Sequence, residues 1–294
     1  MTEHLKEGLH KDIPLEQYIS DPAPEPSLSK GTIKRIIQKT PAHAMYHHPR
    51  LNPNCPREDS TRTDLGSAVH SQILGGPEVI FAPEEFTDWK KKAAQIFRKE
   101  AREEGKIALL AKNQVEVATA AVNAKKVLQT LPHWKDDYQT EGTMIWKDGA
   151  SWKRGRFDIW NPGSNCMIDV RTCTSADPAQ WIKTNMMNGG YDIQAEHYLD
   201  GICALEKPKR RPRFFFLLVE IEPPFCSLLV ALDPEYEDFA QRKIKHGTHV
   251  WQACLESGTW PGYSTRPHYA ELKPWVREEA EVRMLYNEEA LNNE

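Results

Sequence analysis

Two aspartates in one short stretch of the chain have the type and spacing to hold a metal ion. Asp158 and Asp169 lie in Ser151–Trp160 and Cys166–Thr172, two segments rich in β-forming residues. The Asn-Pro-Gly-Ser between them favours a tight turn centred on Pro-Gly, so we expect a hairpin. In that hairpin Asp158 faces Met167 and lies diagonal to Asp169 on one face. Two carboxylates this close repel each other, and a divalent cation is the simplest way to keep both ionised.

Arg171 adds a positive charge to this face, because side chains two residues apart on a strand point the same way. Two carboxylates and a guanidinium then converge on one patch. The same residues also suit a surface hairpin with an ordinary exposed Asp–Arg pair. The hairpin alone does not separate these two interpretations.

The composition is that of a folded protein with one large domain or two small ones. The chain has 294 residues, of which 39% are hydrophobic, with nine Trp, nine Tyr and nine Phe. This composition excludes a wholly disordered chain. The net charge is −4, so binding to a nucleic acid would need a local basic surface.

The cysteines and the apolar windows predict a cytoplasmic protein that does not enter a membrane. The six cysteines are scattered without the spacing of a zinc site, which favours reduced thiols. The N-terminus is charged and has no signal-peptide core. No window approaches the roughly 18 apolar residues of a membrane span.

Helical periodicity alternates with β-rich runs, which indicates an α/β or α+β fold with a sheet at its centre. We expect a polar N-terminal segment over residues 1–26, one domain over 27–265 and a charged, poorly ordered tail over 266–294. Helices are predicted at residues 29–40, 41–48, 64–74, 88–105, 112–131, 177–187, 191–206 and 235–256, and strands at 138–146, 151–160, 166–172, 213–221 and 226–232.

Histidines occur in two of these predicted helices. His43, His47 and His48 fall at a polar helix end, where exposed imidazoles are more typical than a metal site. His70 lies on the 64–74 helix. A single His in such a helix is usually structural, and it becomes a candidate ligand only if it points at the two aspartates.

Several motifs, taken in order, resemble a known superfamily. They are SLSKGTIKRIIQKTPAHAMYH, LGSAVH, a strand that carries Glu141, the GRFD–IDV hairpin, QAEHY and WPGYS, spread over roughly residues 14–265. In this combination the chain is similar to the PD-(D/E)xK nucleases and, within them, to the RecE-like (exodeoxyribonuclease VIII C-terminal type) exonucleases. The resemblance implies a restriction-endonuclease-like core with a mixed central β-sheet flanked by helices.

The resemblance also implies the site. The metal ligands would be His70, Asp158 and Asp169, a set of hard oxygens and one imidazole that suits Mg²⁺ or Mn²⁺. The remaining catalytic positions would be the acidic Glu141 before the hairpin, Arg171 after the second aspartate, and the QxxxY residues Gln194 and Tyr198.

The activity implied is Mg²⁺-dependent hydrolysis of linear double-stranded DNA from a 5′ end, in recombination or DNA processing in a bacterial or phage-infected cell. Relatives of this type form rings, so a trimeric or tetrameric homo-oligomer is expected, with a single-strand annealing protein of RecT type as a partner.

Six basic residues are candidates for contacts with the DNA backbone: Lys153, Arg154, Arg156, Lys209, Arg210 and Arg211. The last three belong to the run Lys207–Arg213, which could follow a phosphate backbone and is equally typical of an ordinary solvated loop.

Arg171 departs from the family pattern, which has lysine two residues after the second aspartate. A guanidinium stays charged at all relevant pH values and cannot act as a general base. The sequence leaves three explanations open: a natural variant with altered activity, use of another lysine such as Lys153 or Lys183, or an engineered substitution. A catalytically weakened protein that binds DNA ends is therefore the alternative to an exonuclease.

Overall fold

The computed structural model describes residues 4–56 and 64–292. The chain divides into two compact units, Met1–Pro261 and Gly262–Glu294, and the candidate site belongs entirely to the first. Among the described residues, no helix combines the length and the apolar character needed to cross a bilayer.

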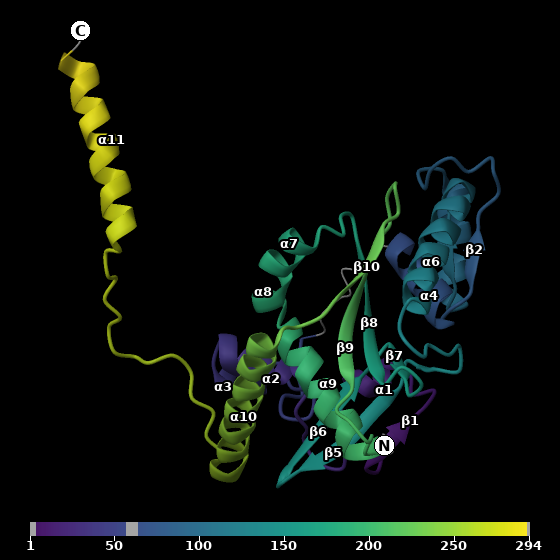
Figure 1. The fold of residues 1–294 in the computed structure, drawn as a ribbon, viewed down its shortest axis with the longest axis horizontal. Helices are drawn as coiled ribbons and strands as arrows, with labels where there is room; N and C mark the ends of the chain where they lie inside the picture. The colour runs from purple at the N-terminus through teal and green to yellow at the C-terminus, as the bar shows by residue number, and fades with distance from the viewer. Residues whose placement is uncertain (1–3, 57–63, 293–294) are drawn as a thin grey trace. The chain divides into compact units, whose positions relative to one another are not determined.

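A five-stranded sheet forms the centre of the first unit (Figure 1). Its order is β10 (Ser227–Val230), β9 (Arg213–Glu220), β8 (Cys166–Cys173), β7 (Ile159–Asn161) and β4 (Gln139–Thr140). β8 and β9 are parallel, whereas the other neighbours are antiparallel. The predicted mixed central sheet is therefore confirmed.

Two smaller sheets accompany this one. β5 (Thr143–Asp148) pairs with β6 (Ser151–Arg156) and with β1 (Gly8–His10), so the N-terminal segment forms part of the fold. β2 (Val79–Phe81) and β3 (Ile107–Leu109) form a short parallel pair that the sequence patterns did not predict. Three-residue strands carry too little alternation to be recognised.

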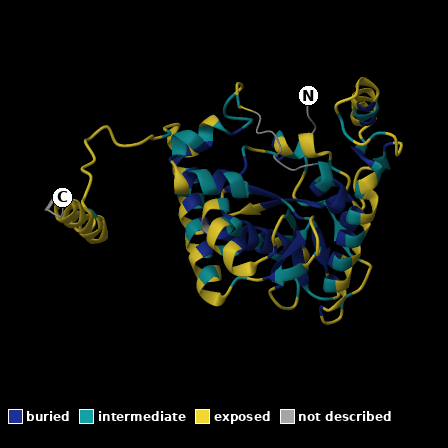
Figure 2. Cartoon of the chain, turned by 90° about the horizontal axis from the view of Figure 1, so that it is seen from above, coloured by how far each residue is buried: buried dark blue, intermediate teal, exposed yellow. Residues whose placement is uncertain are grey.

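Helices cover both faces of the central sheet, and the strands between them are buried (Figure 2). On one face, Ile168 and Val170 of β8 share an apolar cluster with residues of α4 (Asp64–Leu74) and α6 (Gln114–Gln129). On the other face lies α9 (Tyr191–Glu206), whose Ala195, Tyr198, Leu199 and Ile202 share a cluster with Met167, Phe216 and Leu218. Helices from both faces can thus supply side chains to one part of the sheet.

The remaining helices complete the unit. α2 (Lys30–Gln38), α3 (Pro41–Tyr46) and α10 (Pro234–Ser257) share a third apolar cluster centred on Ile33, Ile244 and Trp251. The other short or peripheral helices are α1 (Leu15–Ile19), α5 (Lys92–Glu103), α7 (Pro178–Trp181) and α8 (Met187–Gly189). Ser29 caps α2 by accepting a hydrogen bond from the Thr32 amide at 3.2 Å, as its position before a helical repeat predicts.

Two details of the predicted hairpin are wrong. The expected strand 151–160 is divided into β6 and β7, which belong to different sheets. The turn is centred one residue later than Pro162-Gly163, because Asn161 pairs with Cys166 and the Asn161 side chain accepts the Ser164 amide at 3.0 Å. This asparagine-stabilised turn is longer than a two-residue Pro-Gly turn.

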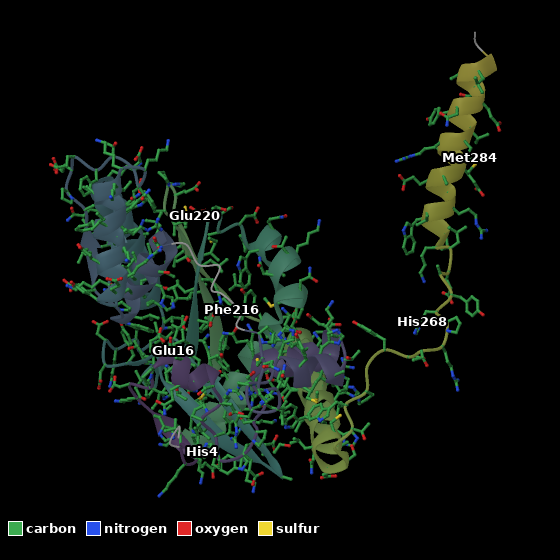
Figure 3. All side chains as sticks on the ribbon, turned by 180° about the vertical axis from the view of Figure 1, so that it is seen from behind. His4, Glu16, Phe216, Glu220, His268 and Met284 are labelled. Carbon is green, nitrogen blue, oxygen red and sulfur yellow. The ribbon has the colours of Figure 1, made fainter. Side chains whose placement is uncertain are left out.

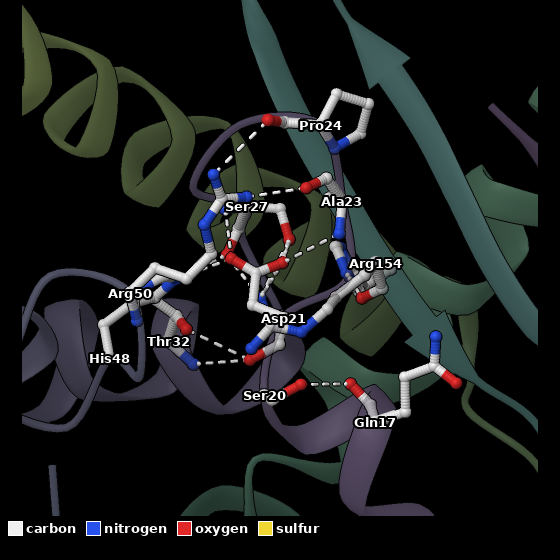
Figure 4. A network of polar contacts seen from close by, with 12 residues as sticks. Gln17, Ser20, Asp21, Ala23, Pro24, Ser27, Thr32, His48, Arg50 and Arg154 are labelled. Carbon is white, nitrogen blue, oxygen red and sulfur yellow. Dashed lines mark hydrogen bonds and ion pairs between the residues drawn. The ribbon is translucent and has the colours of Figure 1, made fainter. Parts of the chain in front are cut away.

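A buried polar network joins the N-terminal segment to β6 (Figure 4). Asp21 contacts Arg154 at 3.1 Å and His48 at 3.3 Å, and it accepts the Ser27 amide at 2.9 Å. Arg50 donates to the Ala23 carbonyl at 2.6 Å. His48 is only 1% exposed, so the expectation of an exposed imidazole is wrong at this position.

The second unit contains α11 (Pro274–Asn292), so the expectation of a poorly ordered tail is wrong for these residues. Its large apolar side chains are exposed, Met284 among them at 60% (Figure 3). Figure 3 also shows Phe216 within the body of the first unit and Glu220 at the end of β9.

Candidate active site

Three acidic residues, here called the acidic row, lie side by side: Glu141 between β4 and β5, Asp158 between β6 and β7, and Asp169 within β8. Thr140 pairs with Ile159 and Thr143 with Arg156, so the same register places Glu141 opposite Asp158. The Glu141 amide donates to the Asp158 carbonyl at 3.0 Å across this break.

The hairpin register places Asp158 opposite Asp169, since Ile159 pairs with Ile168. The predicted partner of Asp158, Met167, pairs instead with Trp160. The shift is two residues, so Asp158 and Asp169 keep a common face and become direct rather than diagonal neighbours.

A glycine shapes this break. Glu141 has a left-handed backbone with φ of +53°, and Gly142 follows it. A methyl group at Gly142 would overlap the ring of Phe157. Only glycine lets the Phe157 ring approach the backbone this closely, and Phe157 immediately precedes Asp158. The position of the carboxylates therefore depends on a residue with no side chain.

His70 reaches this row from α4. Its Nε2 lies 3.4 Å from Asp158 Oδ2, and its Nδ1 lies 3.8 Å from Glu141 Oε1. His70, Glu141 and Asp158 each offer a ligand atom, and these atoms all lie within 4.8 Å of one another. His70 therefore lies beside Asp158, as predicted. Among the described residues, the second acidic member of this cluster is Glu141 and not the predicted Asp169.

Asp158 is held in its ionised form. Burial by itself would raise the pKa of Asp158, but the hydrogen bond and charge of His70, the charge of Arg171 and the Val170 amide together lower it. The Val170 amide donates to Asp158 Oδ2 at 2.7 Å. Asp158 thus presents a fixed negative charge beside His70.

Asp169 lies in a second cluster with Arg171 and Gln194. It forms an ion pair with Arg171 and accepts a hydrogen bond from the Gln194 amide nitrogen. Burial and the neighbouring Asp158 nevertheless raise the pKa of Asp169, and Arg171 offsets only part of this effect. Its Oδ2 is buried and pairs with the Arg171 guanidinium outside hydrogen-bond geometry, so a metal ion at this oxygen would compete with Arg171.

A pocket of about 320 Å³ opens over these clusters. It is lined by residues of five chain segments: Leu15, Tyr18, Ser29, Lys30, Gly31, Arg156, Asp158, Asp169, Arg171, Gln194 and Tyr198. The structure thus gathers six of the predicted site residues in the lining of one pocket: Arg156, Asp158, Asp169, Arg171, Gln194 and Tyr198. The volume suits a small polar group such as a phosphate with its water, and the lining supplies both signs of charge.

The predicted DNA-binding residues separate into two kinds. Lys153 and Arg154 are 2% and 5% exposed, and their partners are internal: Asp148 for Lys153, and Asp21 and Ser27 for Arg154. Arg156 lines the pocket, although it also forms an ion pair with Glu141 at 2.8 Å. Of Lys153, Arg154 and Arg156, we therefore keep only Arg156 as a candidate for contact with DNA.

The basic run before β9 is only partly free to bind an anion. Arg211 contacts Glu196 at 2.7 Å and Asp200 at 3.0 Å, while Lys209 and Arg210 are exposed. None of the three lines the pocket. Contact with a DNA backbone stays a prediction for Lys209 and Arg210.

Lys30 is the pocket residue that the sequence reasoning missed. It is the first residue of α2 and donates to Gln194 Oε1 at 2.8 Å. The lysines considered from the sequence, Lys153 and Lys183, do not line the pocket. The available signal was weak: a lysine directly after the helix cap Ser29, in the SLSKG motif.

One family matches most of the chain. It is described as "PDDEXK-like domain of unknown function (DUF3799)", and the match covers residues 29–273. The chain belongs to this PDDEXK-like family. The resemblance to the PD-(D/E)xK superfamily is thereby confirmed, and the acidic row, the Arg171 position and Gln194 lie in the matched region. No protein of curated function matches the sequence.

One solved structure supports the fold of this PDDEXK-like domain. A proposed exonuclease from Eubacterium rectale is 15% identical, with a TM-score of 0.58 over 90% of this chain and 97% of that one. An alkaline exonuclease from Laribacter hongkongensis is also 15% identical, with a TM-score of 0.32 over 65% of this chain and 95% of that one. The first similarity shows a shared fold.

The donor atoms of the PDDEXK-like domain fit a hard divalent cation. Two ligands of one Mg²⁺, each about 2.1 Å from the ion, lie at most about 4.2 Å apart. The donor atoms of His70, Glu141 and Asp158, one from each residue, lie within 4.8 Å of one another, so at most a small movement of the side chains brings all three within this limit. Carboxylates with one imidazole are ligands that Mg²⁺ and Mn²⁺ accept, and Asp169 Oδ2 provides a further oxygen nearby.

Proposed function

We propose that the protein is a Mg²⁺-dependent exodeoxyribonuclease. It hydrolyses phosphodiester bonds of linear double-stranded DNA from the 5′ end, in recombination or DNA processing, and Mn²⁺ can replace Mg²⁺. The observation that carries the proposal is the row Glu141–Asp158–Asp169 with His70 beside it, in a fold of PDDEXK-like type.

The proposed roles follow from the geometry. Asp158, Glu141 and His70 hold the cation, with Asp169 opposite Asp158 on the neighbouring strand. Bound there, a divalent cation would supply Lewis-acid polarisation of a phosphoryl oxygen and a water of lowered pKa. Burial by itself would lower the pKa of Arg171, but the charges of Asp169, Tyr191 and Asp158 outweigh it and raise the pKa, so Arg171 keeps its charge. It can therefore neutralise a phosphate in the pocket.

Gln194 holds the two halves of the site together. Its side-chain nitrogen donates to Asp169, and its oxygen accepts from Arg171 Nη2 at 2.9 Å. An amide can bridge a carboxylate and a cation in this way because it offers both a donor and an acceptor. Gln194 thereby fixes the distance between Asp169 of the acidic row and the Arg171 guanidinium, which faces the DNA.

The net reaction adds water across one phosphodiester. The water oxygen bonds to phosphorus, the bond to the departing oxygen breaks, and that oxygen takes a proton. The products are a phosphate monoester and a hydroxyl end. The charges of Arg156, Arg171 and Lys30 around the pocket suit the negative backbone of such a substrate.

The test is digestion of linear duplex DNA labelled at the 5′ or the 3′ end, with closed circular DNA alongside. With Mg²⁺ we expect loss of the linear duplex, early release of the 5′ label, and intact circles. Asp158→Ala should abolish digestion, whereas Asp238→Ala on the exposed face of α10 should not. If the wild-type protein leaves linear duplex intact with both Mg²⁺ and Mn²⁺, the proposal fails; cut circles would refute the exonuclease assignment.

A second candidate, a DNA-end-binding protein with weakened catalysis, is favoured by one observation. Arg171 occupies the position of the family's lysine, and both Asp169 and Gln194 already hold it. Arg171→Lys separates the two candidates when the wild type binds DNA without cutting it. If the variant also binds and fails to cut, the binding function is supported.

The expected ring of three or four subunits and the RecT-type annealing partner stay predictions. Light scattering of the purified full chain tests the first. Co-purification with an annealing protein encoded beside it tests the second.

A further inference from the structure

The pocket contains a lysine although the expected lysine position holds Arg171. Lys30 Nζ and Arg171 Nη2 donate to the same atom, Gln194 Oε1, at 2.8 and 2.9 Å. Both cations also lie over the ring of Tyr191, at 4.8 Å for Lys30 and 4.5 Å for Arg171. The Lys30 amine from α2 thus shares two partners, Gln194 and Tyr191, with the Arg171 guanidinium from β8.

Two local features fix this placement. Leu28 pairs with Lys153 of β6 in parallel, with hydrogen bonds at 2.8 and 2.9 Å on either side. Ser29 then caps α2, so Lys30 begins the helix directly beside the acidic row. A side chain anchored by a strand contact and a helix cap is better positioned than one on a flexible loop.

We propose that Lys30 is a catalytic residue that takes the place of the missing lysine, its Nζ holding the attacking water while Arg171 holds the phosphate. The inference rests on the proposed nuclease function. In this arrangement Lys30 and Arg171 share two tasks, holding the water and holding the phosphate, that a single lysine beside an acidic pair would combine. An amine is compact and has rotatable donors, whereas the planar guanidinium is fixed by its ion pair with Asp169.

The charges around Lys30 agree with this role. Arg171 and Asp169 face it from β8, Asp192 from α9 and Lys34 from α2. Burial and the charge of Arg171 lower the pKa of Lys30 to about 7, and the two aspartates only partly oppose them. The amine is therefore less firmly protonated than an exposed lysine, as is useful beside a water that must lose a proton.

The test compares removal of the amine with exchange of its position. Single-turnover digestion of linear duplex is measured for the wild type, Lys30→Met, Lys30→Arg, Arg171→Lys and the exchange variant Lys30→Arg/Arg171→Lys. Lys39→Met, at the exposed C-terminal end of α2, is the matched control. Mn²⁺ titration calorimetry and thermal melting establish that each variant folds and keeps its metal site.

We expect Lys30→Met and Lys30→Arg to lose about 10²–10⁴-fold in turnover, with Mn²⁺ affinity and KM for DNA within about threefold of wild type. We expect the exchange variant to recover at least about tenfold over Lys30→Arg, because it restores one amine beside Asp169. Lys39→Met should remain within about threefold. A structural role for Lys30 would not produce recovery in the exchange variant.

Three results would overturn the inference: wild-type turnover in Lys30→Met, wild-type turnover in Lys30→Arg, or an exchange variant no better than Lys30→Arg. If Lys30→Met does not fold, Lys30→Arg and the exchange variant still decide, because both keep the charge. All these outcomes require a wild type that digests DNA. A wild type that does not digest DNA refutes the proposed function instead.

Discussion

Asp21 and Asp169 are both nearly buried aspartates beside an arginine, yet their surroundings act on them in opposite directions. They are 2% and 4% exposed. Burial raises the pKa of each, but Arg154, His48 and Ser27 together lower the pKa of Asp21 below its ordinary value. At Asp169, Arg171 does not compensate for burial and for the neighbouring Asp158, and the pKa is raised.

The difference shows which polar cluster serves the fold and which is suited to binding. The Asp21 network matches each carboxylate oxygen with donors from Ser27, His48 or Arg154. The acidic row places three carboxylates on adjacent segments, where the Arg171 guanidinium pairs with Asp169 Oδ2 outside hydrogen-bond geometry and does not compensate for burial and for the charge of Asp158. A carboxylate that is fully matched by donors stabilises the fold without a ligand. Carboxylates whose charge is only partly compensated gain most stability when a cation binds.

The largest stability effect should come from removing Asp21. Asp21→Ala leaves Arg154 buried with no carboxylate partner, so we expect a loss of about 3–5 kcal/mol in the free energy of unfolding. Urea denaturation at neutral pH measures it. Glu25→Ala, an exposed change in the same loop, should stay within about 0.5 kcal/mol. A loss below about 1 kcal/mol for Asp21→Ala would show that the network does not hold the fold.

Gly142→Ala should damage the fold less and the candidate site more. The added methyl group meets the Phe157 ring, and overpacking of this kind costs about 1–3 kcal/mol. The shift of Phe157 moves Asp158, so Mn²⁺ affinity should fall more than tenfold in calorimetry. Gly262→Ala meets nothing within 4 Å and serves as the control. Unchanged Mn²⁺ binding in Gly142→Ala would separate the strand break from the metal site.

His197, which contacts Arg154 of the Asp21 network, makes the stability of the fold depend on pH. Burial and the charge of Lys153 lower the pKa of His197 to about 3, and its Nε2 lies 3.0 Å from the Arg154 carbonyl oxygen. Between about pH 6.5 and 3 the unfolded chain binds a proton that the folded chain refuses. Stability therefore falls as pH falls through this window, by up to about 1.4 kcal/mol per pH unit.

The measurement is urea denaturation from pH 7 to 4, comparing wild type with His197→Asn. The slope between pH 6 and 4 should be shallower in the variant, even if its stability at pH 7 is lower. His246→Asn, at an exposed position of α10, should keep the wild-type slope. Parallel curves for wild type and His197→Asn would contradict a neutral buried imidazole.

Much of the fold could be predicted because its signals are local. Helix caps such as Ser29, the 64–74 apolar face and the β-rich runs each lie within a short window. The division between β6 and β7 could not, since it depends on the left-handed Glu141 and on Gly142, which belong to the partner strand. A break imposed by a neighbour leaves no mark in the strand that it divides.

The site was predictable only where residue type and spacing were enough. Asp158 and Asp169 stood out because a hairpin brings them together over a few residues. Lys30 did not, because it is 164 residues from its partner Gln194 and its neighbours in sequence are those of an ordinary helix start. His48 was misread for the same reason: its buried partner Asp21 lies in a segment that appeared polar and peripheral.

Asp169→Asn tests the contrast between Asp21 and Asp169 most directly, although its expected effect on stability is the smallest. Asparagine keeps the shape and the contact with Gln194 but removes one charge from the row. Because the folded state raises the pKa of Asp169, ionisation of this group at neutral pH costs stability. We therefore expect the variant to be at least as stable as wild type, by up to about 1 kcal/mol, the opposite of Asp21→Ala. Thermal melting without metal measures this.

Adding Mn²⁺ should reverse the order in which wild type and Asp169→Asn melt. A cation at 100 times its Kd stabilises the wild-type fold by about 2.7 kcal/mol. Asp169→Asn should gain less, because one nearby carboxylate has become a neutral amide. A variant that melts lower than wild type without metal, or that gains as much from Mn²⁺, would mean that Asp169 serves the fold as Asp21 does. The raised pKa would then reflect burial alone, and the cation would depend only on His70, Glu141 and Asp158.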